Sequence, residues 1–458
     1  DMAVVSVARG STPYVSLHYI SLNSLISKKH SINEPAWKQI CTPDEMITGF
    51  AVYGHTAYVL SFHKNPNGCL MKYDLNGKSL TNEILINTKD EVLEDLIQTQ
   101  NYIYVKRLKN GFSQLTRIDV HSNEQREVEL PFTGYITLKP PFPYPPFFLN
   151  SPSLFFTMES WNKELNGYYY DPNLNQVAES GIRTSGKYGN PADIIVKEVE
   201  IVSHDGVAVP LSIIHSKNVS LDGTNPTLLE AYGSYGISMN SHFDLGLLTW
   251  LRMGGIYAVA HVRGGGEKGD SWYKAGYKAN KPNTWKDFIA CAEYLIKNKY
   301  TSSTKLAAKG VSAGGIPVGM AVIERPNLFK AALLQVAGLN SLRYENTRNN
   351  FTIPEFGTAK DSTEFNYLYA MDIYHNIKDN VQYPSLLITG EVNDELIDIW
   401  QPGKAAARFQ EVSKGKHNVV LFKVGDSGHS GNSDRIIDEL DNYSFLFWQL
   451  NDPRFKLK

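Results

Sequence analysis

The sequence predicts an all-β domain followed by a domain in which strands and helices alternate. The first 190 residues contain short strands separated by polar turns. From Pro191 onward, buried strands alternate with helical segments, which is typical of a mostly parallel sheet covered by helices on both faces. We therefore expect an all-β domain over residues 1–190 and an α/β domain over residues 191–458.

The all-β half repeats a pair of strands. Each pair is expected to hold an inner strand, a polar turn and an outer strand that ends in Asp or Asn, and the unit recurs roughly every 45 to 50 residues. A repeat made of strands alone predicts β-propeller blades, and this chain would carry about four of them. A β-sandwich with accidental spacing is the alternative. The expected pairs are 57–62 with 68–77, 102–108 with 112–125 and 153–160 with 167–176, preceded by a partial unit at 14–22.

The stretch KPPFPYPPFF (139–148) interrupts this pattern. Proline cannot donate a hydrogen bond to a neighbouring strand, so the stretch predicts an extended loop.

The α/β half opens with a predicted hairpin, 194–203 with 207–216. Apolar residues of 284–298 fall on one helical face, which predicts an amphipathic helix, and Thr284 is expected to cap its N-terminus. Another amphipathic helix is expected at the end of the chain, near 433–450. Ligands of parallel sheets bind beyond the carboxyl ends of the strands, so these ends are the places to search for a site. The buried strands are expected at 226–233, 256–264, 305–310, 331–338, 383–390 and 418–425.

Charge and composition narrow the classes of function. The chain has 45 basic and 47 acidic residues, a net charge of −2, which implies no broad electrostatic attraction to nucleic acid or to an anionic membrane. No apolar run is long enough to span a bilayer. The 3 cysteines are scattered without metal-binding spacing, so we expect a reducing, cytoplasmic location, with a periplasmic or secreted one as the alternatives. The chain opens as if within a strand, and we expect its original N-terminus, with any targeting segment, to be missing.

One serine motif carries the chemistry. Gly310-Val311-Ser312-Ala313-Gly314 has the form G-x-S-x-G and lies between a predicted strand and a predicted helix. Glycines permit the sharp turn that exposes a nucleophile, and the following helix start directs N–H groups toward developing negative charge. A glycine-rich loop without catalytic meaning is the alternative, so a base and an orienting acid are needed beside the serine.

Both partners are available at later strand ends. Asp394 follows the next-to-last predicted strand and His429 follows the last one. The chain order Ser, Asp, His is that of α/β-hydrolases, in which the histidine takes the serine proton and the aspartate orients the imidazole. Asp398 is the second choice for the acid.

Further motifs point to one family. EAYGSYG (230–236), RGGGEKGDSW (263–272), RPNLFKAALLQVAG (325–338), WQPGK (400–404) and DSGHSG (426–431) accompany the serine motif. Together they resemble the prolyl oligopeptidase family of serine peptidases. The motif sequences are similar to those of bacterial members, including oligopeptidase B-like enzymes. The resemblance covers 195–458 in detail and 1–190 only in architecture. It implies an α/β-hydrolase domain with a β-propeller, and it implies that part of the propeller and a further N-terminal segment are absent from this chain.

The resemblance also implies site residues. Tyr232, in the motif Tyr-Gly-Ser-Tyr, and the backbone N–H of Ala313 would stabilise the oxyanion. Tyr235 and Leu339 match positions of the substrate pocket.

Departures from the family leave the preferred substrate residue open. Ala313 stands where proline-specific relatives have asparagine, and Glu395 and Leu396 stand where an arginine would follow the catalytic aspartate. The tryptophan expected to stack on proline is missing from 349–358, where Phe351 or Phe356 would replace it. Glu355 would instead favour a basic residue.

The expected function is hydrolysis of peptide bonds in oligopeptides through an acyl-enzyme on Ser312, after Pro or a basic residue, without metal or organic cofactor. Three alternatives stay open. They are an esterase or lipase with the same triad, a non-catalytic peptide-binding protein, and a subunit that is active only with the missing N-terminal part as its partner.

Overall fold

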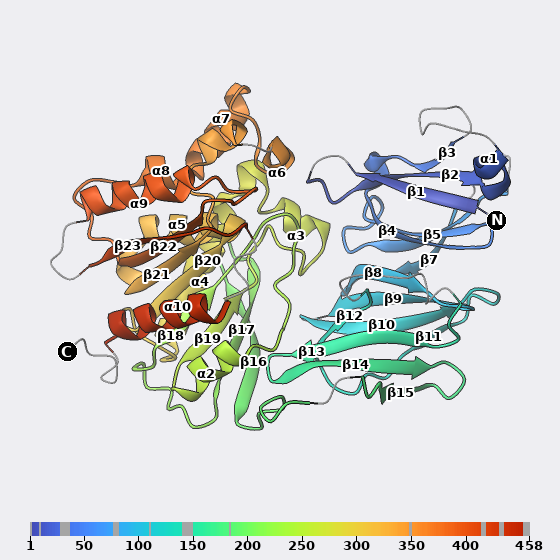
Figure 1. Cartoon of the computed structure of the whole chain (residues 1–458), viewed down its shortest axis with the longest axis horizontal. Coiled ribbons are helices and arrows are strands. Elements are labelled where there is room, and N and C mark those ends of the chain that lie inside the picture. Colours follow the sequence, from blue (N-terminus) through green and yellow to red (C-terminus); the bar gives the residue numbers. More distant parts are fainter. Residues whose placement is uncertain are drawn as a thin grey trace. The chain divides into compact units, whose positions relative to one another are not determined.

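The computed structural model describes residues 2–8, 11–27, 37–76, 82–109, 111–139, 150–182, 185–347, 350–413, 418–429 and 435–451. These residues form two compact units (Figure 1). One holds 1–190 with the short segments 240–243 and 267–271, and the other holds the rest of the chain from 191. The proline-rich stretch lies almost entirely outside the described residues.

The first unit contains antiparallel strand groups in chain order. Two of them are four-stranded sheets, and a third four-stranded meander, β4 to β7, is joined to β1, β2 and β3 by the single pair Val15 with Ile47. The strands are β1 (Met2–Ala8), β2 (Val15–Ser21), β3 (Lys38–Cys41), β4 (Ile47–Tyr53), β5 (Thr56–Ser61), β6 (Cys69–Asp74), β7 (Asn82–Asn87), β8 (Val92–Gln98), β9 (Tyr102–Lys109), β10 (Phe112–Asp119), β11 (Gln125–Glu127), β12 (Tyr135–Thr137), β13 (Leu154–Ser160), β14 (Lys163–Asp171) and β15 (Gln176–Glu179), with the short helix α1 (Leu22–Ser27) after β2.

The predicted strand pairs are the two central strands of each meander: β5 with β6, β9 with β10 and β13 with β14. The interpretation as an inner and an outer strand was therefore wrong. The sequence missed the flanking strands because several of them, such as β11, β12 and β15, are very short and carry little alternation between apolar and polar residues. Apolar side chains such as Tyr58, Leu60, Leu93 and Ile103 fill the space between neighbouring meanders.

The second unit is built around one eight-stranded sheet with the order β16-β17-β19-β18-β20-β21-β22-β23. β16 and β17 are antiparallel, and the six strands from β19 to β23 run parallel. Its strands are β16 (Ile194–Val202), β17 (Ala208–Ser216), β18 (Thr227–Glu230), β19 (Ile256–Ala260), β20 (Leu306–Val311), β21 (Ala331–Gln335), β22 (Ser385–Glu391) and β23 (Val420–Gly425).

Helices cover both faces of this sheet. α2 and α10 pack on one face, and α4, α5 and α9 pack on the other (Figure 1). Central strands are almost wholly buried, as expected for a parallel sheet between helical layers. The helices are α2 (Leu245–Arg252), α3 (Asp270–Lys274), α4 (Pro282–Lys297), α5 (Gly315–Glu324), α6 (Ile353–Phe356), α7 (Ser362–Ala370), α8 (Ile373–Asn376), α9 (Trp400–Val412) and α10 (Arg435–Gln449).

The expected role of Thr284 was wrong. α4 begins at Pro282, so Thr284 lies inside the first turn, and its buried hydroxyl donates to the carbonyl oxygen of Lys281 at 2.8 Å. The proline two residues earlier starts the helix, because proline at the first position lacks only an N–H that the helix would leave unpaired.

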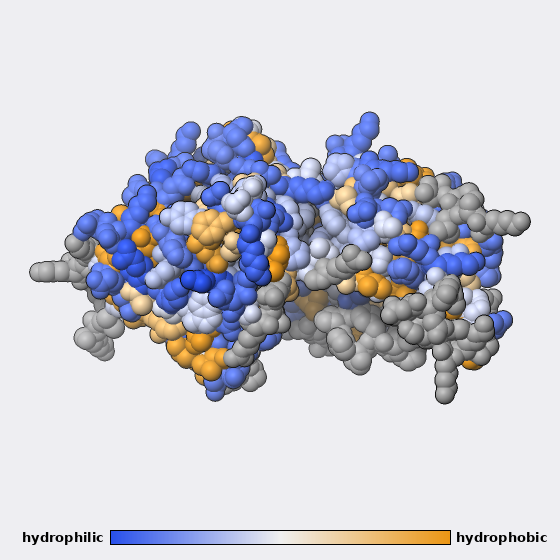
Figure 2. Space-filling view, turned by 90° about the horizontal axis from the view of Figure 1, so that it is seen from above, coloured by the Kyte–Doolittle hydropathy of each residue, from blue (hydrophilic) through white to orange (hydrophobic). Residues whose placement is uncertain are grey.

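Within the described ranges, no helix combines the length and the apolarity needed to cross a bilayer. On the face shown in Figure 2, hydrophilic residues cover most of the described surface and apolar residues form separate patches.

Candidate active site

Ser312 lies at the tip of a sharp turn between β20 and α5. Val311 still has extended backbone angles, whereas Ser312 has φ +55°, in the left-handed region that residues other than glycine rarely adopt. Such a conformation costs about 1–3 kcal/mol and persists only where the surrounding structure holds it. The turn projects the serine side chain beyond the end of the strand, toward the space where the other strand ends meet.

Close backbone contacts explain two glycines of the motif. A Cβ atom on Gly310 would lie 2.3 Å from the carbonyl oxygen of Gly314, and one on Gly314 would lie 2.6 Å from that of Ala231. Neither contact is sterically acceptable for a side chain. The glycines therefore allow the turn to close against β18.

The structure brings His429 and Asp394 to Ser312. Nε2 of His429 lies 2.9 Å from Oγ of Ser312, and Nδ1 lies 2.8 Å and 3.0 Å from the two carboxylate oxygens of Asp394. Because an ionised carboxylate can only accept, Nδ1 carries the imidazole proton and Nε2 is free to accept the serine proton. This is the arrangement of a charge-stabilised base beside an activated nucleophile.

Asp394 is fixed from behind by the backbone. It is 2% exposed, and its Oδ1 accepts from the N–H groups of Leu396 and Ile397, each at 2.8 Å. These bonds fix the orientation of the carboxylate that faces the imidazole. His429 contacts Asp394 and not Asp398, the second candidate for the acid.

Strand order explains why these residues meet. β18 and β20 are neighbours, but the chain leaves β18 toward β19 on one side and leaves β20 toward β21 on the other. At such a reversal the connecting loops diverge and open a crevice at the carboxyl ends of the strands. Tyr232 follows β18, and Ser312 follows β20, so both border this crevice.

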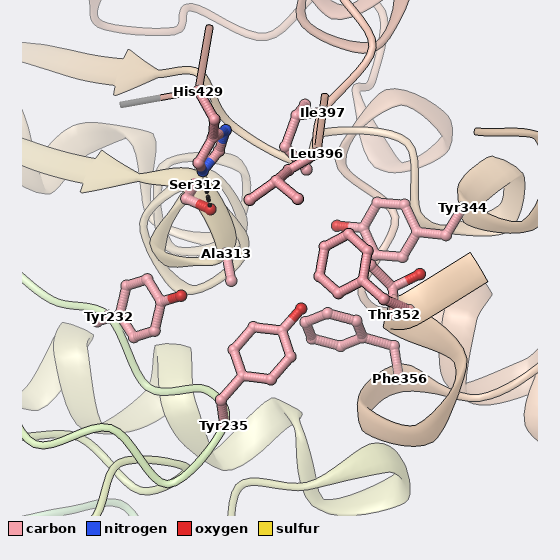
Figure 3. Close-up of a pocket in the computed structure, with 11 residues that line it drawn as sticks. Tyr232, Tyr235, Ser312, Ala313, Tyr344, Thr352, Phe356, Leu396, Ile397 and His429 are labelled. Carbon is pink, nitrogen blue, oxygen red and sulfur yellow. Dashed lines mark hydrogen bonds between the residues drawn. The ribbon is translucent and has the colours of Figure 1, made fainter. Parts of the chain in front are cut away.

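Tyr232 is placed to donate to an oxyanion. Burial raises the pKa of its phenol to about 12, and hydrogen bonding with Ser312 offsets part of the rise. The hydroxyl therefore stays protonated at neutral pH. In Figure 3 it points toward Ala313, whose backbone follows the nucleophile in the turn Ser312–Gly314. Donors in such positions stabilise a tetrahedral intermediate of acyl transfer.

A cavity of about 230 Å³ adjoins Ser312 and His429. Aromatic rings form much of its wall, and the hydroxyls of Tyr232 and Tyr235 point into it (Figure 3). Its lining residues are Tyr232, Tyr235, Ser312, Ala313, Tyr344, Phe351, Thr352, Phe356, Leu396, Ile397 and His429.

Comparison with known proteins identifies the family. Residues 241–453 match the model of the prolyl oligopeptidase family. The α/β half of the chain therefore carries a domain of the prolyl oligopeptidase family. A prolyl endopeptidase of Elizabethkingia miricola is 32% identical over 397 residues, which are 81% of this chain and 54% of that protein. A prolyl endopeptidase of Elizabethkingia meningoseptica is 31% identical over 422 residues, which are 88% of this chain and 57% of that protein. The chain thus spans little more than half the length of these relatives.

Solved structures give the same family architecture. A prolyl endopeptidase structure superposes with a TM-score of 0.86 at 26% identity and covers 98% of this chain and 64% of that one. Oligopeptidase B from Leishmania major superposes with a TM-score of 0.83 at 22% identity, covering 98% and 65%. The predicted fold, an α/β-hydrolase domain with part of a β-propeller, is confirmed, and the β-sandwich alternative is set aside.

Two predicted pocket residues of the prolyl oligopeptidase domain lie elsewhere. Leu339 is fully buried in the core beside Gly315 and does not line the cavity. Glu355 is 2% exposed, and its carboxylate accepts from the Tyr235 N–H at 2.8 Å and from the Tyr273 hydroxyl at 2.6 Å. Glu355 is not among the described residues that line the cavity, and that it favours a basic substrate residue stays a prediction.

Sequence reasoning also missed functional residues. Tyr344, Thr352 and Ile397 line the cavity, yet no motif contains them. Lys281 is fully buried behind the pocket, where its Nζ donates to the carbonyl oxygen of Gly233 at 2.7 Å and to Oγ of Ser234 at 2.5 Å. No sequence signal marks this lysine, since its burial depends on the packing of α4 against the loop after β18. Among the described residues, no group of three His, Cys, Asp or Glu side chains is placed to hold a metal ion.

Proposed function

We propose that this chain is the catalytic portion of a serine oligopeptidase that hydrolyses peptide bonds of short peptides through an acyl-enzyme. The observation that supports it is the continuous hydrogen-bonded series from Ser312 through His429 to Asp394. The two Elizabethkingia relatives are prolyl endopeptidases, which supports peptide bonds as the substrate class.

The residues would act in two steps. His429 takes the Ser312 proton as Oγ attacks the carbonyl carbon, and then delivers that proton to the leaving amine as the carbon–nitrogen bond breaks. Water, activated by His429, then releases the acyl group. Tyr232 and the Ala313 N–H would donate to the oxyanion, and Asp394 would stabilise the imidazolium.

The cavity would receive the P1 residue, which lies on the N-terminal side of the broken bond. Of the two expected P1 types, the cavity favours proline over Arg or Lys. The rings of Tyr235 and Phe356 offer an apolar surface, and none of the described lining residues is a carboxylate that could pair with a cation.

A fluorophosphonate probe tests the activated serine, because only a serine with a functioning base reacts readily. Labelling of Ser312 in the wild type, and none in Ser312→Ala, would support the proposal. A peptide amide with proline at P1 should be hydrolysed by the wild type alone. Labelling without hydrolysis of any peptide, together with rapid cleavage of a p-nitrophenyl ester, would instead identify an esterase.

A further inference from the structure

The loop that carries Tyr232 has a strained backbone. Gly233, Tyr235 and Gly236 have φ values of +65°, +59° and +64°, all in the left-handed region. This conformation is unfavourable for a tyrosine, and a glycine has many other conformations available to it. Such a loop keeps one shape only where contacts from the rest of the protein hold it. The position of the Tyr232 phenol, which projects from this loop (Figure 3), therefore depends on those contacts.

Lys281 supplies two of these contacts from inside the protein. Its Nζ donates to the carbonyl oxygen of Gly233 at 2.7 Å and to Oγ of Ser234 at 2.5 Å, and these are the two residues that directly follow Tyr232. Burial lowers the pKa of Lys281 to about 8, so the amine is protonated at neutral pH. Hydrogen bonds from a charged donor are stronger than those from a neutral one, and these two are shielded from water because Lys281 and Ser234 are fully buried.

Glu355 extends the same support to the other end of the loop. Its Oε1 lies 3.9 Å from Nζ of Lys281 and accepts from the Tyr235 N–H at 2.8 Å, and its Oε2 accepts from the Tyr273 hydroxyl at 2.6 Å. Both members of the ion pair are buried, so each compensates a charge that would otherwise be costly to bury. The loop is thus held on the Gly233 side by the lysine and on the Tyr235 side by the carboxylate.

We propose that Lys281 is a positioning residue that holds the oxyanion donor Tyr232 in place through the backbone of Gly233 and the side chain of Ser234. The inference rests on the proposed function, because it takes Tyr232 to donate to the oxyanion of an acyl-transfer reaction. Lys281 is not among the described residues that line the cavity, so it acts on the reaction through the loop and not by touching the substrate. Its loss should therefore weaken transition-state stabilisation and leave substrate binding nearly unchanged.

A double-mutant cycle tests this link. Wild type, Lys281→Met, Tyr232→Phe and the double variant are compared by kcat and KM for a peptide amide with proline at P1, using the full 458-residue chain. We expect Lys281→Met to lower kcat at least about tenfold while KM stays within about twofold. In the Tyr232→Phe background the same replacement should lower kcat by no more than about twofold, because the group that Lys281 positions is already missing.

Lys286→Met is the matched control. Lys286 lies on the same helix, α4, and its ammonium pairs with the partly exposed Glu324, so kcat should remain near the wild-type value. The inference is overturned if Lys281→Met lowers kcat by the same factor in both backgrounds, because that result indicates a general structural role. It is also overturned if KM rises while kcat is unchanged.

A second measurement does not depend on peptide hydrolysis. Attack of Ser312 on a fluorophosphonate probe places negative charge on a phosphoryl oxygen, so the labelling rate also reports on the oxyanion donors. Slower labelling in Lys281→Met, with little further slowing when it is added to Tyr232→Phe, supports the inference even if no peptide amide is cleaved and the proposed function fails. Equal labelling rates of Lys281→Met and the wild type overturn it.

Urea unfolding checks that each variant is folded. If Lys281→Met does not fold, Ser234→Ala takes its place in the cycle, because it removes one of the two acceptors of the lysine and leaves the charge in place. We expect Ser234→Ala to slow labelling about threefold in the wild-type background and to have no further effect in Tyr232→Phe. Equal slowing in both backgrounds contradicts the inference.

Discussion

Asp394→Asn should invert the tautomer of the catalytic imidazole. Oδ1 of Asp394 accepts two backbone N–H groups, from Leu396 and Ile397, so the amide oxygen of asparagine must occupy that position. The amide nitrogen then takes the place of Oδ2, 2.8 Å from Nδ1 of His429. Because this nitrogen can only donate, Nδ1 must accept, and the imidazole proton moves to Nε2. Nε2 then faces Ser312 as a donor and cannot take its proton.

The size of the effect follows from this inversion. The same replacement in a serine protease with this arrangement lowers kcat about 10⁴-fold, which at ~1.36 kcal/mol per tenfold is about 5.5 kcal/mol of transition-state stabilisation. The fold should be retained, because the two backbone bonds to Oδ1 persist, and we expect the free energy of unfolding to change by only about 1 kcal/mol.

The assay measures kcat for a peptide amide and the rate of fluorophosphonate labelling of Ser312, with urea unfolding as the check of the fold. Asp398→Asn is the matched control, since Asp398 does not contact His429, and its kcat should remain near that of the wild type. The reasoning is refuted if Asp394→Asn keeps a tenth or more of wild-type kcat, or if Asp398→Asn causes the loss instead.

Three further results are expected. Tyr232→Phe should lower kcat about 10²- to 10³-fold with little change in KM, because an oxyanion donor acts mainly in the transition state; an unchanged kcat would remove Tyr232 from that role. Gly310→Ala should destabilise the fold by at least about 1–3 kcal/mol in urea unfolding, because its Cβ would lie 2.3 Å from the Gly314 carbonyl oxygen. Gly403→Ala is the control and should be neutral or stabilising, because its Cβ would meet Phe422 at 3.6 Å, an ordinary contact distance. Burial lowers the pKa of Lys281 from 10.5 to about 8. Between these pH values the Lys281 amine is protonated in the unfolded chain but not in the folded one. The free energy of unfolding should therefore rise by an amount on the order of 3 kcal/mol as pH increases from 8 to about 10.5. Lys281→Met should lack this rise, and an identical pH dependence in both proteins would contradict the assignment.

Local pattern was sufficient for much of the fold. Alternation of buried strands with helices predicted the α/β half, and all eight strands of its sheet fall where the apolar runs place them. The strand ends could be predicted equally well, because Ser312, Asp394 and His429 each lie within four residues of the end of such a run. The signal is strong because parallel strands buried on both faces must be apolar throughout.

The sequence alone determined the fold class and the chain order of the three residues expected to carry the chemistry. Only the tertiary structure decided the pocket. Tyr344 and Thr352 line the cavity, whereas Leu339 and Glu355 are not among its described lining residues, and no short-range periodicity encodes that difference. Likewise, nothing in the sequence distinguishes Lys281 from an exposed lysine. It is buried only because the first turn of helix α4 packs against the loop that carries Tyr235. Specificity depends on such long-range contacts, whereas strands and turns depend on neighbours in the chain.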